Sequence, residues 1–129
     1  MAPALDHTIV ACRNKERSAR YLADVFGLGD PQRSGRFLAV QLENGVTLDY
    51  SEDGDETSTI ATQHYAFVVG EEEFDEIFGR IVERGQAYWA DPGLRRSSQV
   101  ATRGNGRGVY FKDPDGHLLE ILTRSPGGS

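Results

Sequence analysis

The chain has 129 residues, with 14 Lys and Arg against 20 Asp and Glu, so its net charge at neutral pH is −6. This length fits one domain, and the hydrophobic share of 38% and charged share of 26% are those of an ordinary globular protein. No segment has the ~20 apolar residues of a transmembrane helix, and residues 1–6 lack a signal-peptide pattern, so we expect a cytoplasmic protein without a membrane partner. An acidic chain also lacks the basic face that nucleic acids require. The single cysteine, Cys12, excludes a disulfide within the chain and a cysteine-rich zinc site, which leaves a small enzyme or a binding domain.

The first half of the chain predicts a strand, a helix and a hairpin. The alternating residues of 5–11 indicate a strand, Asn14 is a good helix N-cap, and apolar residues at helical spacing then continue to Gly27. After an expected loop come two more strands, 37–42 and 46–50. The dipeptide Asn44-Gly45 between them favours a hairpin with a type I′ turn.

The second half repeats this order after a polar acidic run at 52–56, which we interpret as a solvated linker. Residues 64–69 predict a strand, and an apolar stripe from Phe74 to Val82 predicts a helix that ends at Gly85. A long polar loop is expected at 91–108. The other expected strands are 87–89, 109–111 and 117–122, the last two joined by the turn Asp113-Pro114-Asp115-Gly116.

The shared order of elements indicates an internal duplication. His7 and His64 lie 57 positions apart, and Gly45 and Gly116 lie 71 apart, with the extra length in the 91–108 loop. We therefore expect one domain, residues 1–124, followed by a disordered tail. Its boundaries are predicted as follows: module one 5–53, module two 62–124, and tail 125–129.

Strand periodicity predicts that His7, His64, Asp49 and Glu120 lie on the sheet faces that the helices leave uncovered. Alternate residues of a strand face opposite sides, and the other side of each strand carries large apolar residues for a helix to cover. Two imidazoles with one or two carboxylates match a divalent-metal site with open positions. Either histidine alone can also be read as an ordinary half-buried group, whereas a carboxylate among apolar neighbours, as at Glu120, needs a cation or strong donors. His117, on the face opposite Glu120, is expected to be a turn or surface histidine and is excluded as a ligand.

The residues of 108–121 resemble the final hairpin, with its metal-binding Glu, of the vicinal oxygen chelate superfamily. This superfamily is also called the glyoxalase/bleomycin resistance protein/dioxygenase superfamily. Segments 5–7 and 64–68 resemble its two ligand-bearing first strands. The resemblance implies an α+β fold in which two tandem βαβββ modules form a curled, cleft-bearing mixed sheet. It also implies a homodimer and a small-molecule substrate or ligand.

By this resemblance, His7, His64 and Glu120 are the ligands of a divalent metal ion, and Zn, Fe, Mn, Ni and Co all stay open as its identity. Asp49 falls where glyoxalase I enzymes usually carry a fourth ligand, a Glu. Because Asp is one methylene shorter, Asp49 is either a ligand or a catalytic base, and Tyr110 is a candidate catalytic donor.

The leading functional interpretation is a metal-dependent lyase or isomerase of the glyoxalase type, acting on a small substrate that chelates the metal through oxygen. Four arginines between positions 95 and 107 favour an anionic substrate, with Arg103 and Arg107 as candidate substrate-binding residues, although a charged loop can simply be solvated.

Three other functions stay open. A fosfomycin-inactivating transferase would use two His and one Glu in the same way. An extradiol-type dioxygenase is less favoured, because Arg103 stands where that branch carries an upstream histidine. A metal-free binding protein of the bleomycin-resistance type is the alternative from outside enzymology.

Overall fold

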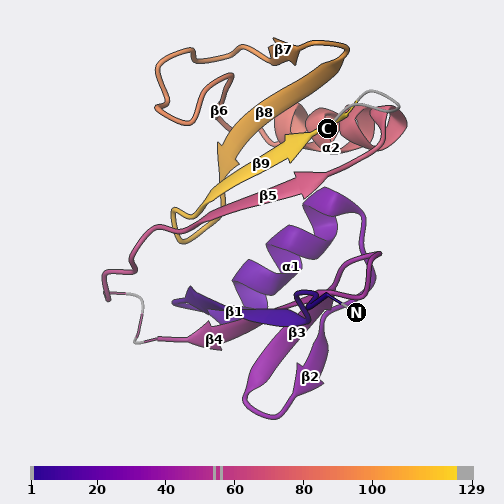
Figure 1. Ribbon diagram of the computed structural model, residues 1–129. Helices are drawn as coiled ribbons and strands as arrows, with labels where there is room; N and C mark the ends of the chain where they lie inside the picture. The colour runs from indigo at the N-terminus through magenta and orange to yellow at the C-terminus, as the bar shows by residue number, and fades with distance from the viewer. Residues whose placement is uncertain (1, 54, 56, 125–129) are drawn as a thin grey trace. The chain divides into compact units, whose positions relative to one another are not determined.

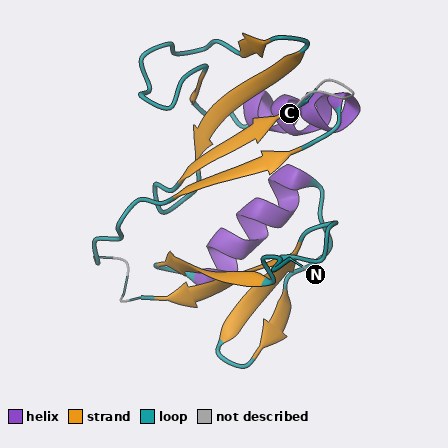
Figure 2. Ribbon diagram, in the orientation of Figure 1, coloured by secondary structure: helices purple, strands orange, loops and turns teal. Residues whose placement is uncertain are grey.

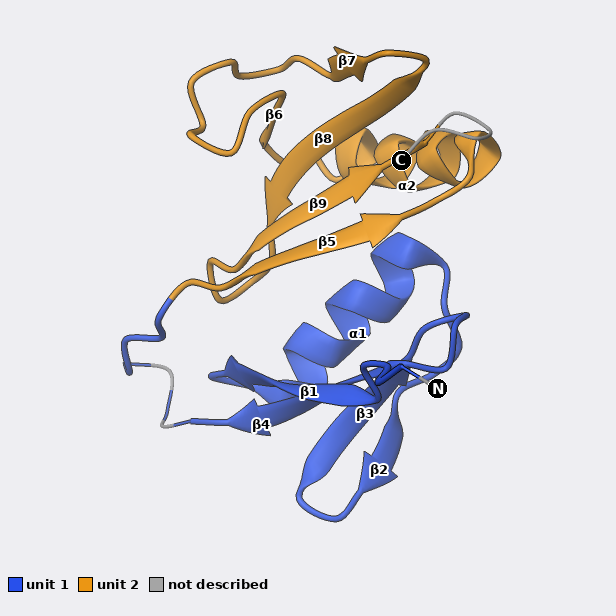
Figure 3. Cartoon of the chain, viewed as in Figure 1, with its two compact units in different colours: residues 1–61 blue, residues 62–129 orange. Residues whose placement is uncertain are grey.

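The computed structural model describes residues 2–53, 55 and 57–124, which form two compact units on either side of the junction between Ala61 and Thr62 (Figure 3). Each unit contains a helix and a β-sheet, as Figure 2 shows. The predicted α+β class is therefore confirmed. The predicted tail at 125–129 lies outside the described residues, as do two positions of the predicted 52–56 linker.

Unit 1 has a four-stranded sheet in the order β1-β4-β3-β2, with β1 and β4 parallel and the other pairs antiparallel (Figure 1). Its elements are β1 His7–Cys12, α1 Lys15–Phe26, β2 Gln32–Ser34, β3 Phe37–Gln41 and β4 Thr47–Glu52. The predicted limits of α1 are confirmed, because the Asn14 side chain accepts a hydrogen bond from the Arg17 backbone and Gly27 ends the helix at φ 68°. β2 was expected to be a loop. Its three exposed residues carry no apolar alternation, and only pairing with β3 defines it.

Unit 2 has the same strand order, β5-β9-β8-β6, with β5 and β9 parallel. Its elements are β5 His64–Val68, α2 Glu71–Glu83, β6 Tyr88–Trp89, β7 Ala101–Arg103, β8 Gly106–Lys112 and β9 Leu118–Leu122. The prediction of one uninterrupted loop over 91–108 is wrong in part, because β7 forms there and pairs with the start of β8. This short strand is mostly exposed and polar, so its sequence has the composition of a loop.

The predicted duplication is confirmed at the level of strand register. His7 lies opposite Thr47 in unit 1, and His64 lies opposite Leu118 in unit 2. Both units also end in the same hairpin, closed by hydrogen bonds from the backbone N–H of Gly45 and Gly116 to the carbonyl three residues earlier.

The predicted type I′ turn at Asn44-Gly45 is wrong. That turn needs positive φ at both central residues, whereas Gly45 has φ 88° and Asn44 is not among the residues with positive φ. The hydrogen bonds from Gly45 to the Leu42 carbonyl and from Leu42 to the Val46 carbonyl define a three-residue loop, a type I turn followed by a left-handed glycine. Gly116, with φ 87°, has the same place in unit 2.

Alternation along the strands separates a core face from an open face, as predicted. In unit 1 the side chains of Val10, Leu48 and Tyr50 are buried, while His7 and Ile9 are exposed. In unit 2 the core face is buried at Val109, Phe111, Leu119 and Ile121, but Tyr110 and Glu120 on the other face are buried as well, at 4% and 6% exposed. The face opposite the core carries the predicted site residues of both sheets except Arg107.

His117 is buried, so the expectation of a turn or surface histidine is wrong. Its side chain is 0% exposed and its Nδ1 accepts a hydrogen bond from the Gln63 backbone N–H at 3.0 Å. The segment before β5 covers this hairpin, and sequence spacing gives no indication of that contact.

Neither helix within the described ranges has the length and hydrophobicity that a membrane span requires.

Candidate functional site

His64 and Glu120 form the centre of the open face of unit 2. Glu120 on β9 lies opposite Ala66 on β5, so its side chain is on the same face as that of His64, one diagonal step away. His64 Nε2 lies 3.1 Å from Glu120 Oε1. The Glu120 side chain is only 7% exposed, whereas that of His64 is 46% exposed, so the carboxylate is buried behind an imidazole that solvent can reach.

The two contacts of the His64 ring define how it can act. Nδ1 lies 3.2 Å from the carbonyl oxygen of Leu118, which only accepts hydrogen bonds, so Nδ1 carries a proton. Nε2 faces a second acceptor, the Glu120 carboxylate. Either a proton or a metal cation must therefore lie between Nε2 and Oε1, because two lone pairs at this distance would repel.

Arg103 and Tyr110 complete this cluster from β7 and β8. Tyr110 lies opposite Glu120 across the β8–β9 pairing, and its ring stacks on His64 with the centroids 5.9 Å apart. Arg103 donates from Nη1 to Glu120 Oε2 at 3.2 Å and from Nη2 to the Tyr110 hydroxyl at 2.8 Å. The hydrogen bond to Tyr110 is the largest cause of a raised pKa of Arg103, and the charge of Glu120 also contributes, so the guanidinium stays charged.

Unit 1 places His7 and Asp49 in the equivalent arrangement. Asp49 lies opposite Ile9, one diagonal step from His7, and accepts a hydrogen bond from the Thr47 hydroxyl at 3.0 Å. His7 Nδ1 lies 2.7 Å from the Asp6 carboxylate, and this hydrogen bond is the largest cause of its raised pKa, to which the charge of Asp49 also contributes. Asp6 is not among the predicted site residues, although its position directly before His7 in the sequence is a signal for this contact.

Arg107 lies on the other face of the sheet. Its guanidinium contacts Glu71 at 2.7 Å and Asp75 at 2.9 Å on α2, and its Cζ lies 4.2 Å from the centroid of the Phe74 ring. The structure thus brings Arg103 to Glu120 and Tyr110, but it does not bring Arg107 to them.

Within the described residues of either unit, no three His, Cys, Asp or Glu side chains are grouped as a metal site. The two-residue pairs nevertheless fit a divalent cation. In each pair the Nδ1 of the histidine is held by an oxygen acceptor, Asp6 for His7 and Leu118 for His64. This contact through Nδ1 leaves Nε2 as the ligating atom, which is the usual arrangement of metal-bound histidine.

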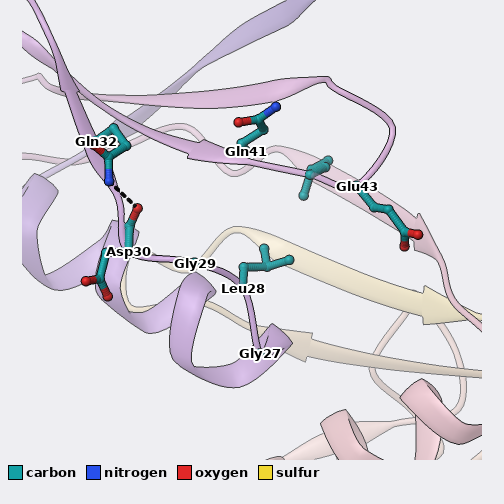
Figure 4. Close-up of a pocket in the computed structure, with 8 residues that line it drawn as sticks. Gly27, Leu28, Gly29, Asp30, Gln32, Gln41 and Glu43 are labelled. Atoms are coloured by element: carbon teal, nitrogen blue, oxygen red, sulfur yellow. Dashed lines mark hydrogen bonds between the residues drawn. The ribbon is translucent and has the colours of Figure 1, made fainter.

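Unit 1 also contains a polar pocket of about 540 Å³, which Figure 4 shows. It is lined by residues 27–30 at the C-terminal end of α1, by Gln32 on β2, and by residues 41–43. The Gln32 side chain donates to the Asp30 carbonyl at its wall. None of the predicted site residues lines this pocket.

The chain is similar to two proteins named as oxidases and to one named as a thiol transferase. Its structure superposes on "Oxidase ChaP-H1" with a TM-score of 0.90 and 54% identity, over 98% of this chain and 100% of that one. "Oxidase ChaP-H2" gives a TM-score of 0.91 and 51% identity, over 99% and 98% of the two chains. "Metallothiol transferase FosB" of Shouchella clausii (strain KSM-K16) is 31% identical, over 95% of this chain and 82% of the transferase. The model of the Glyoxalase/Bleomycin resistance protein/Dioxygenase superfamily matches residues 4–121. The chain therefore belongs to this superfamily, as the resemblance of its final hairpin and first strands predicted.

Proposed function

We propose that this chain is a metal-dependent oxidase, with His7, His64 and Glu120 as the metal ligands. The observation that carries the proposal is the His64–Glu120 pair, a buried carboxylate at 3.1 Å from an imidazole nitrogen whose ring orientation a carbonyl already fixes. His7, held by Asp6 through Nδ1, supplies the second imidazole of a 2-His-1-carboxylate ligand set.

The choice of oxidation chemistry follows from the relatives. Two proteins named oxidases are more than half identical to this chain over nearly all of it, whereas the thiol transferase is 31% identical. A glyoxalase-type lyase or isomerase, the first interpretation of the sequence, becomes the second candidate because neither of these names supports it.

A divalent metal bound by these ligands would polarise substrate oxygens and, if redox-active, take part in electron transfer. The residues of the chain would have separate tasks. Tyr110 offers its hydroxyl hydrogen to a substrate oxygen, and Asp49 accepts a proton as the candidate base. The overall oxidation removes two electrons and two protons from the substrate and reduces dioxygen to hydrogen peroxide. The class of substrate is a small molecule with two neighbouring oxygens, at least one of which can be anionic beside Arg103.

Metal analysis of protein purified without a histidine tag tests the ligand set. We expect close to one Fe, Mn, Co, Ni or Zn per ligand set in the wild type, and its loss in the His64→Ala and Glu120→Ala variants. Glu72→Ala is the matched control, because Glu72 is an exposed carboxylate on α2. A wild-type protein that neither contains nor takes up metal would overturn the proposal and favour the metal-free binding function.

A substrate panel separates the candidate reactions. Oxygen consumption with a catechol that releases hydrogen peroxide, and none with a hemithioacetal, supports the oxidase, whereas oxygen consumption without hydrogen peroxide supports the extradiol-type dioxygenase. Isomerisation of the hemithioacetal supports the lyase or isomerase instead. Formation of a thiol adduct of fosfomycin would support the transferase, which the Arg103–Tyr110 pair also favours as a site for a phosphonate oxygen.

We also propose that the chain is a homodimer, as members of this superfamily often are. Light scattering after size-exclusion chromatography checks this directly, with a mass near twice 14.2 kDa as the expected result.

A further inference from the structure

We propose that Arg103 is a positioning residue. It holds Glu120 with one carboxylate oxygen, Oε1, facing the metal position. It also holds Tyr110 with its hydroxyl hydrogen pointing away from the guanidinium. This inference rests on the proposed metal-dependent function and extends it. This role adds to the one that the sequence suggested for Arg103, the direct binding of an anionic substrate.

The first part follows from the division of the Glu120 carboxylate between two partners. Oε1 lies 3.1 Å from His64 Nε2, and Oε2 accepts a hydrogen bond from Arg103 Nη1. A carboxylate can offer a metal one oxygen or both. With Oε2 occupied by a permanent cation, Glu120 offers Oε1 alone, on the side where His64 presents its ligating nitrogen.

The second part follows from the direction of the other hydrogen bond. Guanidinium groups only donate, so the Tyr110 oxygen is the acceptor of the 2.8 Å contact with Arg103 Nη2. The hydroxyl hydrogen of Tyr110 must then point elsewhere and is free for a substrate oxygen. The same contact withdraws electron density from the phenol, which makes it a better donor.

One side chain produces both effects, because the planar guanidinium of arginine carries two terminal nitrogens that both donate hydrogen bonds. Nη1 and Nη2 reach two acceptors on adjacent strands, Glu120 on β9 and Tyr110 on β8. The Arg103 guanidinium lies above Gly108, where a Cβ would be in ordinary van der Waals contact with Cζ at 3.7 Å. A lysine at position 103 would keep the charge but could not place two donors in one plane.

Cobalt(II) spectroscopy tests the first part, because visible absorbance per cobalt falls as the number of coordinating atoms rises. The full chain is loaded with Co(II) as wild type, Arg103→Met and Arg103→Lys. Arg95→Met is the control, because Arg95 belongs to the same loop and its backbone N–H donates to Asp91, a bond that the substitution keeps. We expect both Arg103 variants to lose absorbance, as Glu120 becomes free to bind through both oxygens, and Arg95→Met to match the wild type.

The imidazole nitrogen shifts of His64, measured by NMR on the metal-free protein, give a second readout. We expect them to move in both Arg103 variants, because the carboxylate opposite Nε2 is no longer held. If Arg103→Lys matches the wild type in both measurements, charge alone is sufficient and the positioning role is overturned. It is also overturned if Arg103→Met matches. If the wild type binds no cobalt, the proposed metal function fails, and the metal-free His64 shifts still decide the role of Arg103.

Discussion

A glycine on β8 gives a sharp test of how tightly the site strands are packed. Gly106 faces the end of β9, where a Cβ would lie 2.4 Å from the carbonyl oxygen of Thr123, about 1 Å inside ordinary contact. The added Cβ is fixed to the Gly106 backbone and the Thr123 carbonyl is itself backbone, so neither can rotate away and Gly106→Ala must push the strands apart. Overpacking of this kind costs about 1–3 kcal/mol. It also strains the two hydrogen bonds between Arg107 and Thr123, worth about 1 kcal/mol each.

Against this cost, alanine lowers the entropy of the unfolded chain and recovers about 0.4–1 kcal/mol. We therefore expect Gly106→Ala to lower the free energy of unfolding by roughly 2–3 kcal/mol. Gly108→Ala is the matched control on the same strand and face, because its Cβ would come no closer than 3.7 Å to any neighbour. Urea unfolding followed by circular dichroism measures both. If the two variants were equally stable, the close approach of β8 and β9 at Gly106 would be refuted.

Three further predictions concern charged groups outside the candidate ligand set. Arg107→Met should lower the free energy of unfolding by about 1–2 kcal/mol, reduced at high salt, because it removes two half-exposed ion pairs and a contact with the Phe74 ring; salt-dependent urea unfolding measures this. The pKa of Glu71 is lowered by hydrogen bonds from Thr123 and Arg107, so its stabilising effect is complete at neutral pH. That effect should disappear as the pH falls through the folded-state pKa, so the stabilities of wild type and Glu71→Gln should converge in acid, and a difference that stays constant from neutral to acid pH would contradict it. Burial raises the pKa of Asp113, whose Oδ2 has no hydrogen-bond partner, so ionisation destabilises the fold. The stability of wild type relative to Asp113→Asn should therefore decline as the pH rises above ~4, in unfolding curves measured across pH.

The fold was predictable where periodicity and turn chemistry agreed. Asn14 and Gly27 bounded α1 correctly, and the spacing of His7, His64 and the two hairpin glycines gave the repeat. The turn at Asn44-Gly45 was assigned the wrong type, whereas two other failures share a cause, because each depends on a segment distant in sequence. β7 is a strand only because β8 pairs with it, and the burial of His117 depends on Gln63, 54 positions earlier.

The candidate site was predictable to the level of strand faces. Alternation correctly put His64 and Glu120 on one face, and the register of β5 against β9 brought them into contact. Periodicity could not distinguish Arg103 from Arg107, because the difference lies in which sheet face each side chain takes and what stands there. Arg107 meets the acidic first turns of α2, whereas Arg103 reaches the carboxylate of Glu120.

Asp49 offers the last test, because the duplication makes it the counterpart of Glu120. Both carboxylates lie one diagonal step from a histidine in the same register, but their surroundings differ. Glu120 is held by the Arg103 cation, whereas Asp49 accepts a hydrogen bond from a neutral hydroxyl, that of Thr47. Asp is also one methylene shorter, so we expect Asp49 to act as a base rather than as a metal ligand.

Two variants separate these roles. Asp49→Asn should keep the wild-type metal content and lower kcat by about 10²–10⁴-fold, the usual contribution of a general base. Glu120→Gln should lose the metal, because an amide is a weaker ligand than a carboxylate and cannot pair with Arg103 as an anion. Metal analysis of the two proteins side by side decides the matter before any substrate is known. Equal loss of metal from the Asp49→Asn and Glu120→Gln variants would show that Asp49 is a fourth ligand. Movement of β4 would then have to compensate for the side chain of Asp49, which is one methylene shorter than that of Glu120.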